Sequence, residues 1–329
     1  MALRERPCAE AIFRQDKIWA RSEGAMPDWC QGVKVVKTMK MIKVMILSLM
    51  ATATFAAESV NETLDAAADG NVKISNVSGS IEVNGWSRSQ VEVTGELGRD
   101  VEELIFKRDG DEVTIKVKLP RGSSRSSSAE LVINVPEASS VQVNTVSADI
   151  DISDVQGEQR LESVSGEITT TVYGAEVDAA SVSGDLEISG DNQTTKAKLH
   201  TVSGDIDVEN LSGEISTESV SGSISTINGA FTRASGNTIN GDIVFHVGLL
   251  DGGRMDFETI NGTVDVDFGG DVSARIDIET FNGDIRNCFG PESVRTSKYA
   301  PGRELSFTEG GGSGRVTINT LNGNVRLCK

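Results

Sequence analysis

The sequence predicts an all-β fold: a β-solenoid with two short strands in each coil of about 20 residues, and an N-terminal antiparallel strand meander as its cap. A four-residue motif that ends in glycine recurs through the chain. Apolar and polar residues alternate beside it, and no helical period appears after residue 56. The 329 residues include 34 Gly but only 6 Pro, a composition unlike collagen or a disordered chain.

The glycine motif carries the repeat. It occurs as NVSG 76–79, TVSA 145–148, SVSG 163–166, SVSG 181–184, TVSG 201–204, SVSG 219–222, TING 238–241, TING 259–262, TFNG 280–283 and TLNG 320–323. With its last residue as position 0, position −2 is always apolar, position +2 is always Ile, Val or Leu, and position +4 is mostly apolar. This alternation is typical of a half-buried strand. A second glycine usually follows within one repeat, which predicts two corners per coil.

A unit of this size cannot bury its own apolar side, so we expect identical units to stack around a common core. Eight or nine coils at a spacing of about 4.8 Å would extend for roughly 40 Å. Residues 86–140 interrupt the repeat and predict four strands of the cap, at Gln90–Leu97, Glu103–Arg108, Glu112–Leu119 and Glu130–Pro136. Residues 289–315 predict a loop and one hairpin, Glu304–Thr308 leading into Arg315–Ile318.

The N-terminal segment differs from the rest. Lys40 and Lys43 precede an apolar run of about a dozen residues, which has the length of a signal-peptide core and is too short to span a bilayer. We expect an over-extended start or disorder over 1–38, a signal peptide over 39–56, a linker over 57–70, first strands and a capping meander over 71–140, and repeats over 141–329, with 71–329 as one domain. An uncleaved membrane anchor is the competing interpretation of 39–56.

Charge and composition argue against several classes of function. Residues 1–56 hold nine of the 31 Lys/Arg and five of the 49 Asp/Glu, so the remaining chain keeps 22 basic and 44 acidic side chains and a net charge of −22. Such acidity argues against a nucleic-acid partner. The chain has only two histidines, His200 and His246, and no serine-nucleophile motif. We therefore expect neither an enzyme nor a cofactor or metal site. Calcium on the rows of carboxylates is an alternative, although a calcium-roll motif is absent.

Position −1 of the motif predicts a structural ladder, in which each polar side chain bonds to its counterpart one coil away. A ligand-binding stripe is the alternative. The ladder residues are Ser165, Ser183, Ser203, Ser221, Asn240, Asn261, Asn282 and Asn322.

Cys288 and Cys328 each lie five residues after a motif glycine. If residues 289–315 are an excursion, the two motifs lie on adjacent coils and a disulfide is within reach. If a full coil intervenes, the Cα atoms lie about 9–10 Å apart, which is too far.

The segments KISNVSGSIEVNGW 73–86 and VPEASSVQVNTVSADIDI 135–152, with the recurring TVSGDI and TINGDI units, resemble the bacterial Toastrack family, domain of unknown function family 4097, which also carries the label "putative adhesin". The resemblance covers about residues 70–329. It implies a β-strand-repeat domain outside the cytoplasmic membrane and a link to envelope stress.

The functional expectation is an exported, non-enzymatic interaction surface in the cell envelope, in the periplasm or at the cell surface. Its partner would be a protein or a polysaccharide. The main alternative is a structural element that self-associates through its ends. A polysaccharide-acting β-helix enzyme is a third class, for which the chain after residue 56 supplies few aromatic sugar platforms: Trp86, Tyr173 and Tyr299 fall in no common position of the repeat.

Overall fold

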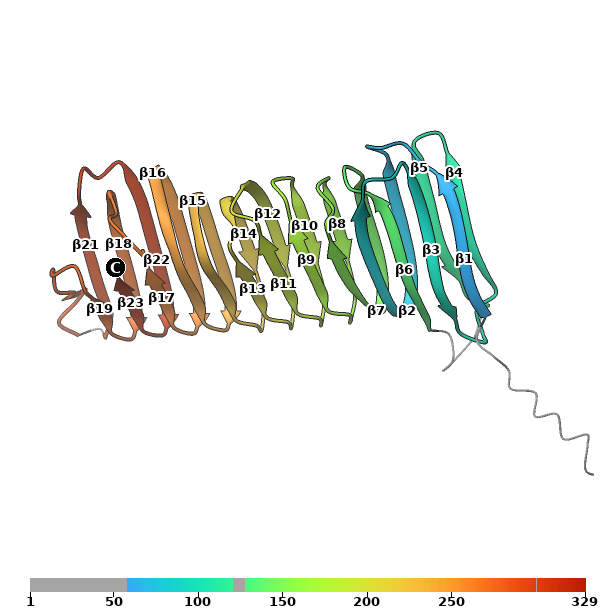
Figure 1. Cartoon of the computed structure of the whole chain (residues 1–329). Helices are drawn as coiled ribbons and strands as arrows, with labels where there is room; N and C mark the ends of the chain where they lie inside the picture. The colour runs from blue at the N-terminus through green and yellow to red at the C-terminus, as the bar shows by residue number, and fades with distance from the viewer. Residues whose placement is uncertain (1–57, 121–127, 300) are drawn as a thin grey trace, which may run out of the picture. The chain divides into compact units, whose positions relative to one another are not determined.

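The computed structural model describes residues 58–120, 128–299 and 301–329. These residues form 23 strands and no helix, which confirms the all-β prediction. The strands join one mixed sheet that winds through successive repeats (Figure 1). The expected start and signal peptide, residues 1–56, lie outside the described residues. A helix with the length and hydropathy of a membrane span is absent from the part of the chain that the structure describes.

The repeats place their strands in two columns of parallel strands. The first column holds the strand that enters each glycine motif, and the second holds the strand that leaves it. In the middle of the chain the first column contains β7 (Ser140–Ser153), β8 (Gln159–Glu162), β10 (Val177–Ala180), β12 (Thr194–His200), β14 (Ser212–Glu218) and the later halves of β15 (Ile224–Asn240) and β16 (Ile243–Asn261). The second column contains the end of β7, β9 (Ile168–Val172), β11 (Leu186–Gly190), β13 (Ile206–Glu209), the first halves of β15 and β16, and β17 (Val264–Asp267).

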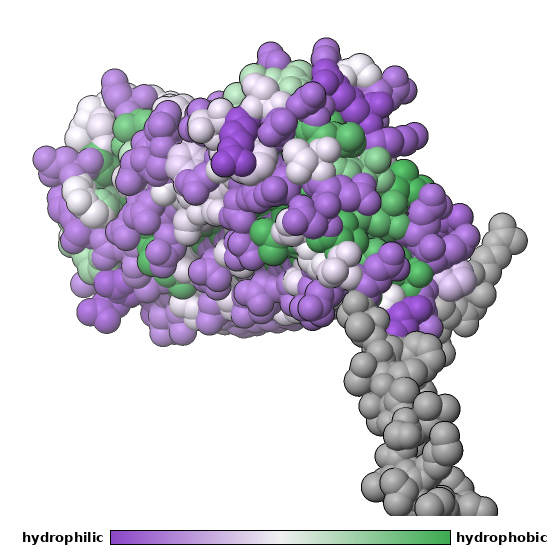
Figure 2. Space-filling view, turned by 45° about the vertical axis from the view of Figure 1, so that its right-hand side comes forward, coloured by the Kyte–Doolittle hydropathy of each residue, from purple (hydrophilic) through white to green (hydrophobic). Residues whose placement is uncertain are grey.

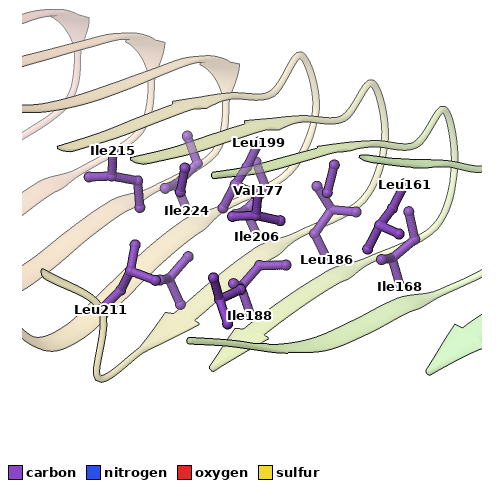
Figure 3. Packing of buried hydrophobic residues seen from close by; sticks show 14 of the residues in the cluster. Leu161, Ile168, Val177, Leu186, Ile188, Leu199, Ile206, Leu211, Ile215 and Ile224 are labelled. Atoms are coloured by element: carbon purple, nitrogen blue, oxygen red, sulfur yellow. The ribbon is translucent and has the colours of Figure 1, made fainter. Parts of the chain in front are cut away.

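The core lies between the two columns. Each strand turns alternate side chains inward, as in β10, where Val177 and Ala179 are buried and their neighbours are half-buried. Because neighbouring strands pair in register, identical positions of successive repeats stack along the core (Figure 3). Leu186, Ile206 and Ile224 form one such row, each 1 % exposed or less. The row buries apolar surface continuously, which no single repeat could do.

The alternation changes phase at the glycine motif. Positions −5 and −3 point inward before the corner, and positions +2 and +4 point inward after it; in one repeat these are Leu199, Thr201, Ile206 and Val208. Position −2, here Val202, is 43 % exposed. The uninterrupted alternation expected across the motif is therefore wrong at this position, because the corner adds one residue to the period of two.

The motif glycine allows neighbouring corners to approach closely. A Cβ built on Gly204 would lie 2.1 Å from the carbonyl oxygen of Gly184, and one on Gly222 would lie 1.8 Å from that of Gly204. The corners at the motif are short and uniform, and they form the lower edge of the stack in Figure 1. The opposite edge carries loops of varied size.

The N-terminal end contains a repeat out of sequence order. β2 (Asn71–Trp86) pairs in parallel with β7 on one side and with β5 (Glu112–Lys118) and β6 (Ala129–Pro136) on the other. The four strands expected over residues 86–140 are present, but they do not form a simple antiparallel meander, because β5 and β6 each pair in parallel with β2 on one side and antiparallel with another strand on the other. The antiparallel pairs are β4 (Glu103–Asp109) with β5, β3 (Gln90–Leu97) with β6, and β1 (Glu58–Asp65) with β3. Strand β1 occupies part of the segment expected to be a linker, 57–70, because it completes the edge of β3.

The C-terminal end is also out of order. β22 (Gly314–Asn322) pairs in parallel with β16 on one side and with β18 (Ala274–Asn282) on the other. In the same way β23 (Val325–Cys328) lies between β17 and β19 (Ile285–Asn287). The last repeat in the sequence therefore lies between the two repeats that precede it.

The hairpin expected between Glu304–Thr308 and Arg315–Ile318 is wrong. β21 (Arg303–Glu309) pairs antiparallel with β18, on the side away from β22, and the short β20 (Val294–Arg295) pairs with β21. The glycine-rich segment 310–314 carries the chain around the end of β18, so the two strands flank β18 without pairing with each other.

Candidate functional site

The clearest candidate site is a row of exposed apolar side chains along the edge formed by the glycine motifs. We name this row the apolar column. It consists of position −2 of all ten motifs, and its members are between 37 and 50 % exposed. They are Val77, Val146, Val164, Val182, Val202, Val220, Ile239, Ile260, Phe281 and Leu321.

The corner geometry explains why these side chains face outward. In the fourth motif Ser181 points into the core at position −3 and the Oγ atom accepts a hydrogen bond from the Gly184 N–H at 2.8 Å. This bond closes the turn and leaves Val182 on its outer side. The same bond joins Gly166 to Ser163, Gly204 to Thr201 and Gly222 to Ser219. A hydroxyl at position −3 therefore fixes the outward direction of position −2.

A shallow groove runs beside the apolar column. Val220, Ile239 and Ile260 form one wall, and His200, Glu218, Asn237 and Glu258, from position −4, form the other. The groove has a volume of about 340 Å³. His200 Nδ1 lies 3.4 Å from Glu218 Oε2 across neighbouring strands. The second histidine, His246, lies elsewhere, 3.8 Å from Asp265, so the structure does not bring the two histidines together.

Carboxylates line the other side of the apolar column at position +1. Asp185 Oδ1 accepts a hydrogen bond from the Asp205 N–H at 2.8 Å, and Asp205 Oδ1 accepts one from the Ser223 N–H at 2.7 Å. Asp149 and Asp242 accept equivalent bonds from the next repeat. These acidic residues thus help to hold one repeat on the next, and each bond uses only one carboxylate oxygen.

The carboxylates that stack along the second column of strands affect the protonation of Asp207 on β13. Burial raises the pKa of Asp207, and the nearby Asp205 raises it further, whereas a hydrogen bond from Ser225 lowers it. Desolvation disfavours the charged form of an acid, and a like charge does the same.

Groups of three or more side chains able to hold a metal ion are absent from the described residues. The carboxylates therefore form rows with no metal-ligand cluster among those residues.

The residues predicted as a ladder at position −1 behave in two ways. In the later repeats the amides bond directly: Asn261 donates to Asn240 at 2.8 Å, Asn322 to Asn261 at 2.9 Å and Asn282 to Asn322 at 2.9 Å. In the earlier repeats Ser165, Ser183, Ser203 and Ser221 are exposed, and the repeats are joined there by backbone bonds such as Ser183 N–H to the Val164 carbonyl at 2.9 Å.

Sequence reasoning missed a second polar row, the buried hydroxyls of position −3. Several of these hydroxyls donate to a backbone carbonyl of the neighbouring repeat in the stack, as Thr280 does to the Gly323 carbonyl at 2.9 Å. The signal was present in the sequence, because position −3 is Ser or Thr in nine of the ten motifs and Asn76 in the other.

Cys288 and Cys328 are joined in a disulfide, with their Cα atoms 4.9 Å apart. The insertion of β23 beside β19 brings them together, and the Cys288 N–H donates to the Leu327 carbonyl at 2.9 Å. The disulfide fixes the end of the chain to the preceding repeat.

A search of curated proteins finds no match. Similar solved structures include a "putative adhesin" from Parabacteroides distasonis (12 % identity, 82 % of this chain, 97 % of that chain, TM-score 0.41) and a "putative lipid binding protein" from the same organism (14 %, 83 %, 97 %, TM-score 0.44). A third is a "putative adhesin" from Bacteroides fragilis (10 %, 82 %, 97 %, TM-score 0.39).

The sequence model of the family described as Toastrack DUF4097 matches residues 71–328, which include all ten glycine motifs and both columns of strands. The chain belongs to the Toastrack family.

Proposed function

We propose that the chain is an exported, non-enzymatic β-solenoid that acts as an interaction surface in the cell envelope. The apolar column carries the proposal. Exposed apolar residues scattered singly are common on proteins, but a contiguous apolar row bordered by polar residues is typical of an interaction site. Position −2 holds an aliphatic or aromatic side chain in all ten motifs of the chain.

Two observations support a location in the cell envelope. Disulfides such as Cys288–Cys328 persist in oxidising compartments outside the cytoplasm. The charged and apolar pattern of residues 39–56 is typical of an export signal. A fusion of residues 1–60 to a reporter enzyme that is active only after export tests this step. We expect reporter activity, and its loss when Leu47 and Leu49 are both replaced by Arg.

The residues around the apolar column support the non-enzymatic part of the proposal. Apart from Ala180 and His200, the neighbours of the apolar column at positions −4, −1 and +1 all carry a hydroxyl, amide or carboxylate group. His200 lies beside Glu218, and the three hydroxyl residues that also line the groove, Thr201, Ser219 and Thr238, are buried and bonded to the backbone of the motif corners.

Self-association through the ends is less well supported. The edge strand β1 carries Glu58 and Glu62 as exposed charges, and β4 carries Lys107 and Arg108. Charges on edge strands oppose edge-to-edge pairing.

A photo-crosslinking residue at position 182 tests the interaction surface in the intact envelope. The control places the same residue at 187, which is exposed on the outer face of β11 away from the column. We expect a discrete crosslinked product from 182, absent from 187. The same crosslinked products from both positions, or no crosslinked product from either, would refute the proposed surface.

A further inference from the structure

The partner of the apolar column can be specified from its surroundings. The column has ten members, so nine repeat spacings of about 4.8 Å give it a length of about 43 Å. It is one side chain wide, because position −3 is buried and position −1 is polar in every motif. A ligand that covers the column must therefore present a long, narrow apolar stripe.

The backbone at the column is not available for pairing. The N–H of Ser165 bonds to the carbonyl of Val146, and the N–H of Ser183 bonds to that of Val164, both between repeats. Recognition by addition of a β-strand needs free backbone groups at a sheet edge. The column offers side chains only, which favours a helix whose apolar stripe lies along it.

The charged residues at the motif positions beside the column are acidic, and two of them pair with an arginine from outside these positions: Glu162 with Arg160 at 3.3 Å and Asp284 with Arg303 at 3.0 Å. Position +1 carries Asp149, Glu167, Asp185, Asp205, Asp242 and Asp284, and position −4 carries Glu162, Glu218, Glu258 and Glu279. Neither position, nor position −1, holds a Lys or Arg in any repeat. The +1 bonds between repeats use Oδ1 of Asp149, Asp185, Asp205 and Asp242, so Oδ2 of these residues can meet a ligand.

From these observations we infer that the apolar column binds a cationic amphipathic helix, with the apolar stripe of the helix on the column and its Lys or Arg residues between the two acidic rows. This inference rests on the proposed interaction surface and names its partner. A helix that covered the whole column would have about 29 residues at 1.5 Å per residue. A second copy of this chain fits less well, because it would bring the same acidic rows together.

We expect the helix to contact the apolar column most closely at the groove. It spans repeats whose column residues are Val220, Ile239 and Ile260, and its far wall carries Glu218 and Glu258. A large apolar side chain of the helix fits between these walls, with a neighbouring Lys near the carboxylates. On the face shown in Figure 2, hydrophilic side chains cover most of the surface, and hydrophobic ones gather at the end with the first strands.

The test measures binding of the full chain to three fluorescent 28-residue peptides by anisotropy. One is a helical Leu/Lys peptide with Leu at heptad positions a and d. The second has Glu in place of every Lys, and the third is a scramble of the first. We expect the Lys helix to bind at least tenfold more tightly than either control, and its affinity to fall as salt rises.

Variants locate the contact. Val182→Ser, Val202→Ser and Val220→Ser together should weaken binding of the Lys helix at least tenfold. The matched control, Leu250→Ser with Val294→Ser, removes exposed apolar side chains outside the column and should change affinity less than twofold. Asp185→Asn with Asp205→Asn removes two charges but keeps Oδ1 as an acceptor, and should weaken binding and its salt dependence. This second variant keeps the test valid if the triple variant does not fold.

Several results would overturn the inference. Equal binding of the Lys helix and its scramble would show charge attraction alone, and equal binding of the Lys and Glu helices would remove the role of the acidic rows. A concentration-dependent dimer that the triple variant abolishes would assign the column to a second copy. If crosslinking from position 182 succeeds in the envelope while the Lys helix does not bind, only the partner chemistry is wrong. If both fail, the proposed function is wrong as well.

Discussion

Asn322 donates a hydrogen bond from its side-chain amide to Asn261 Oδ1 at 2.9 Å, although 61 residues separate the two in the sequence. The motif that follows Asn261 along the chain belongs to Asn282, and this residue bonds to the other side of Asn322. The last repeat therefore separates two repeats that are consecutive in the sequence, and the Cys288–Cys328 disulfide fixes it there.

Replacement of both cysteines by serine should destabilise the fold. The disulfide closes a loop of 40 residues, and the loss of that constraint on the unfolded chain costs about 3–4 kcal/mol. Chemical denaturation of the Cys288→Ser/Cys328→Ser variant checks this value. The original chain under reducing conditions is the control and should match the variant. Equal stability of the oxidised and reduced chains would contradict the prediction.

Replacement of Gly204 by Ala should be poorly tolerated. The new Cβ would lie 2.1 Å from the Gly184 carbonyl oxygen, so neighbouring repeats would have to separate. We expect a loss of about 1–3 kcal/mol in the free energy of unfolding. Gly270→Ala is the matched control, because the nearest atom to its Cβ would be 3.9 Å away, and it should change stability by less than about 0.5 kcal/mol. Similar effects from both substitutions would exclude close packing as the cause.

The hydroxyl row can be tested at Thr280, which is fully buried and donates to the Gly323 carbonyl. Thr280→Val keeps the shape of the side chain but leaves this carbonyl without the bond from the side chain. The expected cost is about 1–3 kcal/mol, measured by denaturation. Thr280→Ser retains the hydroxyl and should recover most of the loss; a serine variant as unstable as the valine variant would point to lost packing.

Asp207 should make the stability depend on pH. Its raised pKa means that the ionised form is disfavoured in the folded state, so Asp207 costs stability at neutral pH. The cost falls as pH decreases through the folded-state pKa and disappears below the ordinary value of 3.8.

Asp207→Asn should therefore raise the free energy of unfolding at pH 7 by up to about 1 kcal/mol and have little effect at pH 3. Ser225→Ala removes the hydrogen bond that lowers this pKa and should shift the pH dependence upward. An effect of Asp207→Asn that is the same at both pH values would contradict this explanation.

Local patterns in the sequence predict much of this fold. The strands of the N-terminal region begin and end close to their expected residues, because alternation and turn residues define them locally. The equal offsets of Cys288 and Cys328 from their motif glycines place them in one register. What no local pattern can specify is which repeats are neighbours. The motif containing Asn322 would pair equally well with any other Asn motif, so the order of the last repeats depends on long-range packing.

The sequence shows the apolar residues of the candidate site, but it does not show that their side chains point outward. Val182 and Leu186 are both apolar and an even number of residues apart, which favours one face of one strand. Only the turn closed by Ser181 and Gly184 reverses the direction of Val182. The constant hydroxyl at position −3 was the signal that could have revealed this change of phase.

The position of the last repeat also determines when the fold can be completed. A chain that emerges from a ribosome releases β18 and β19 before β22 and β23. Until the final residues are free, the space between β16 and β18 has no strand to fill it. A polypeptide that ends before residue 314 therefore lacks β22 and β23, the two strands that join the repeat of β16 and β17 to that of β18 and β19.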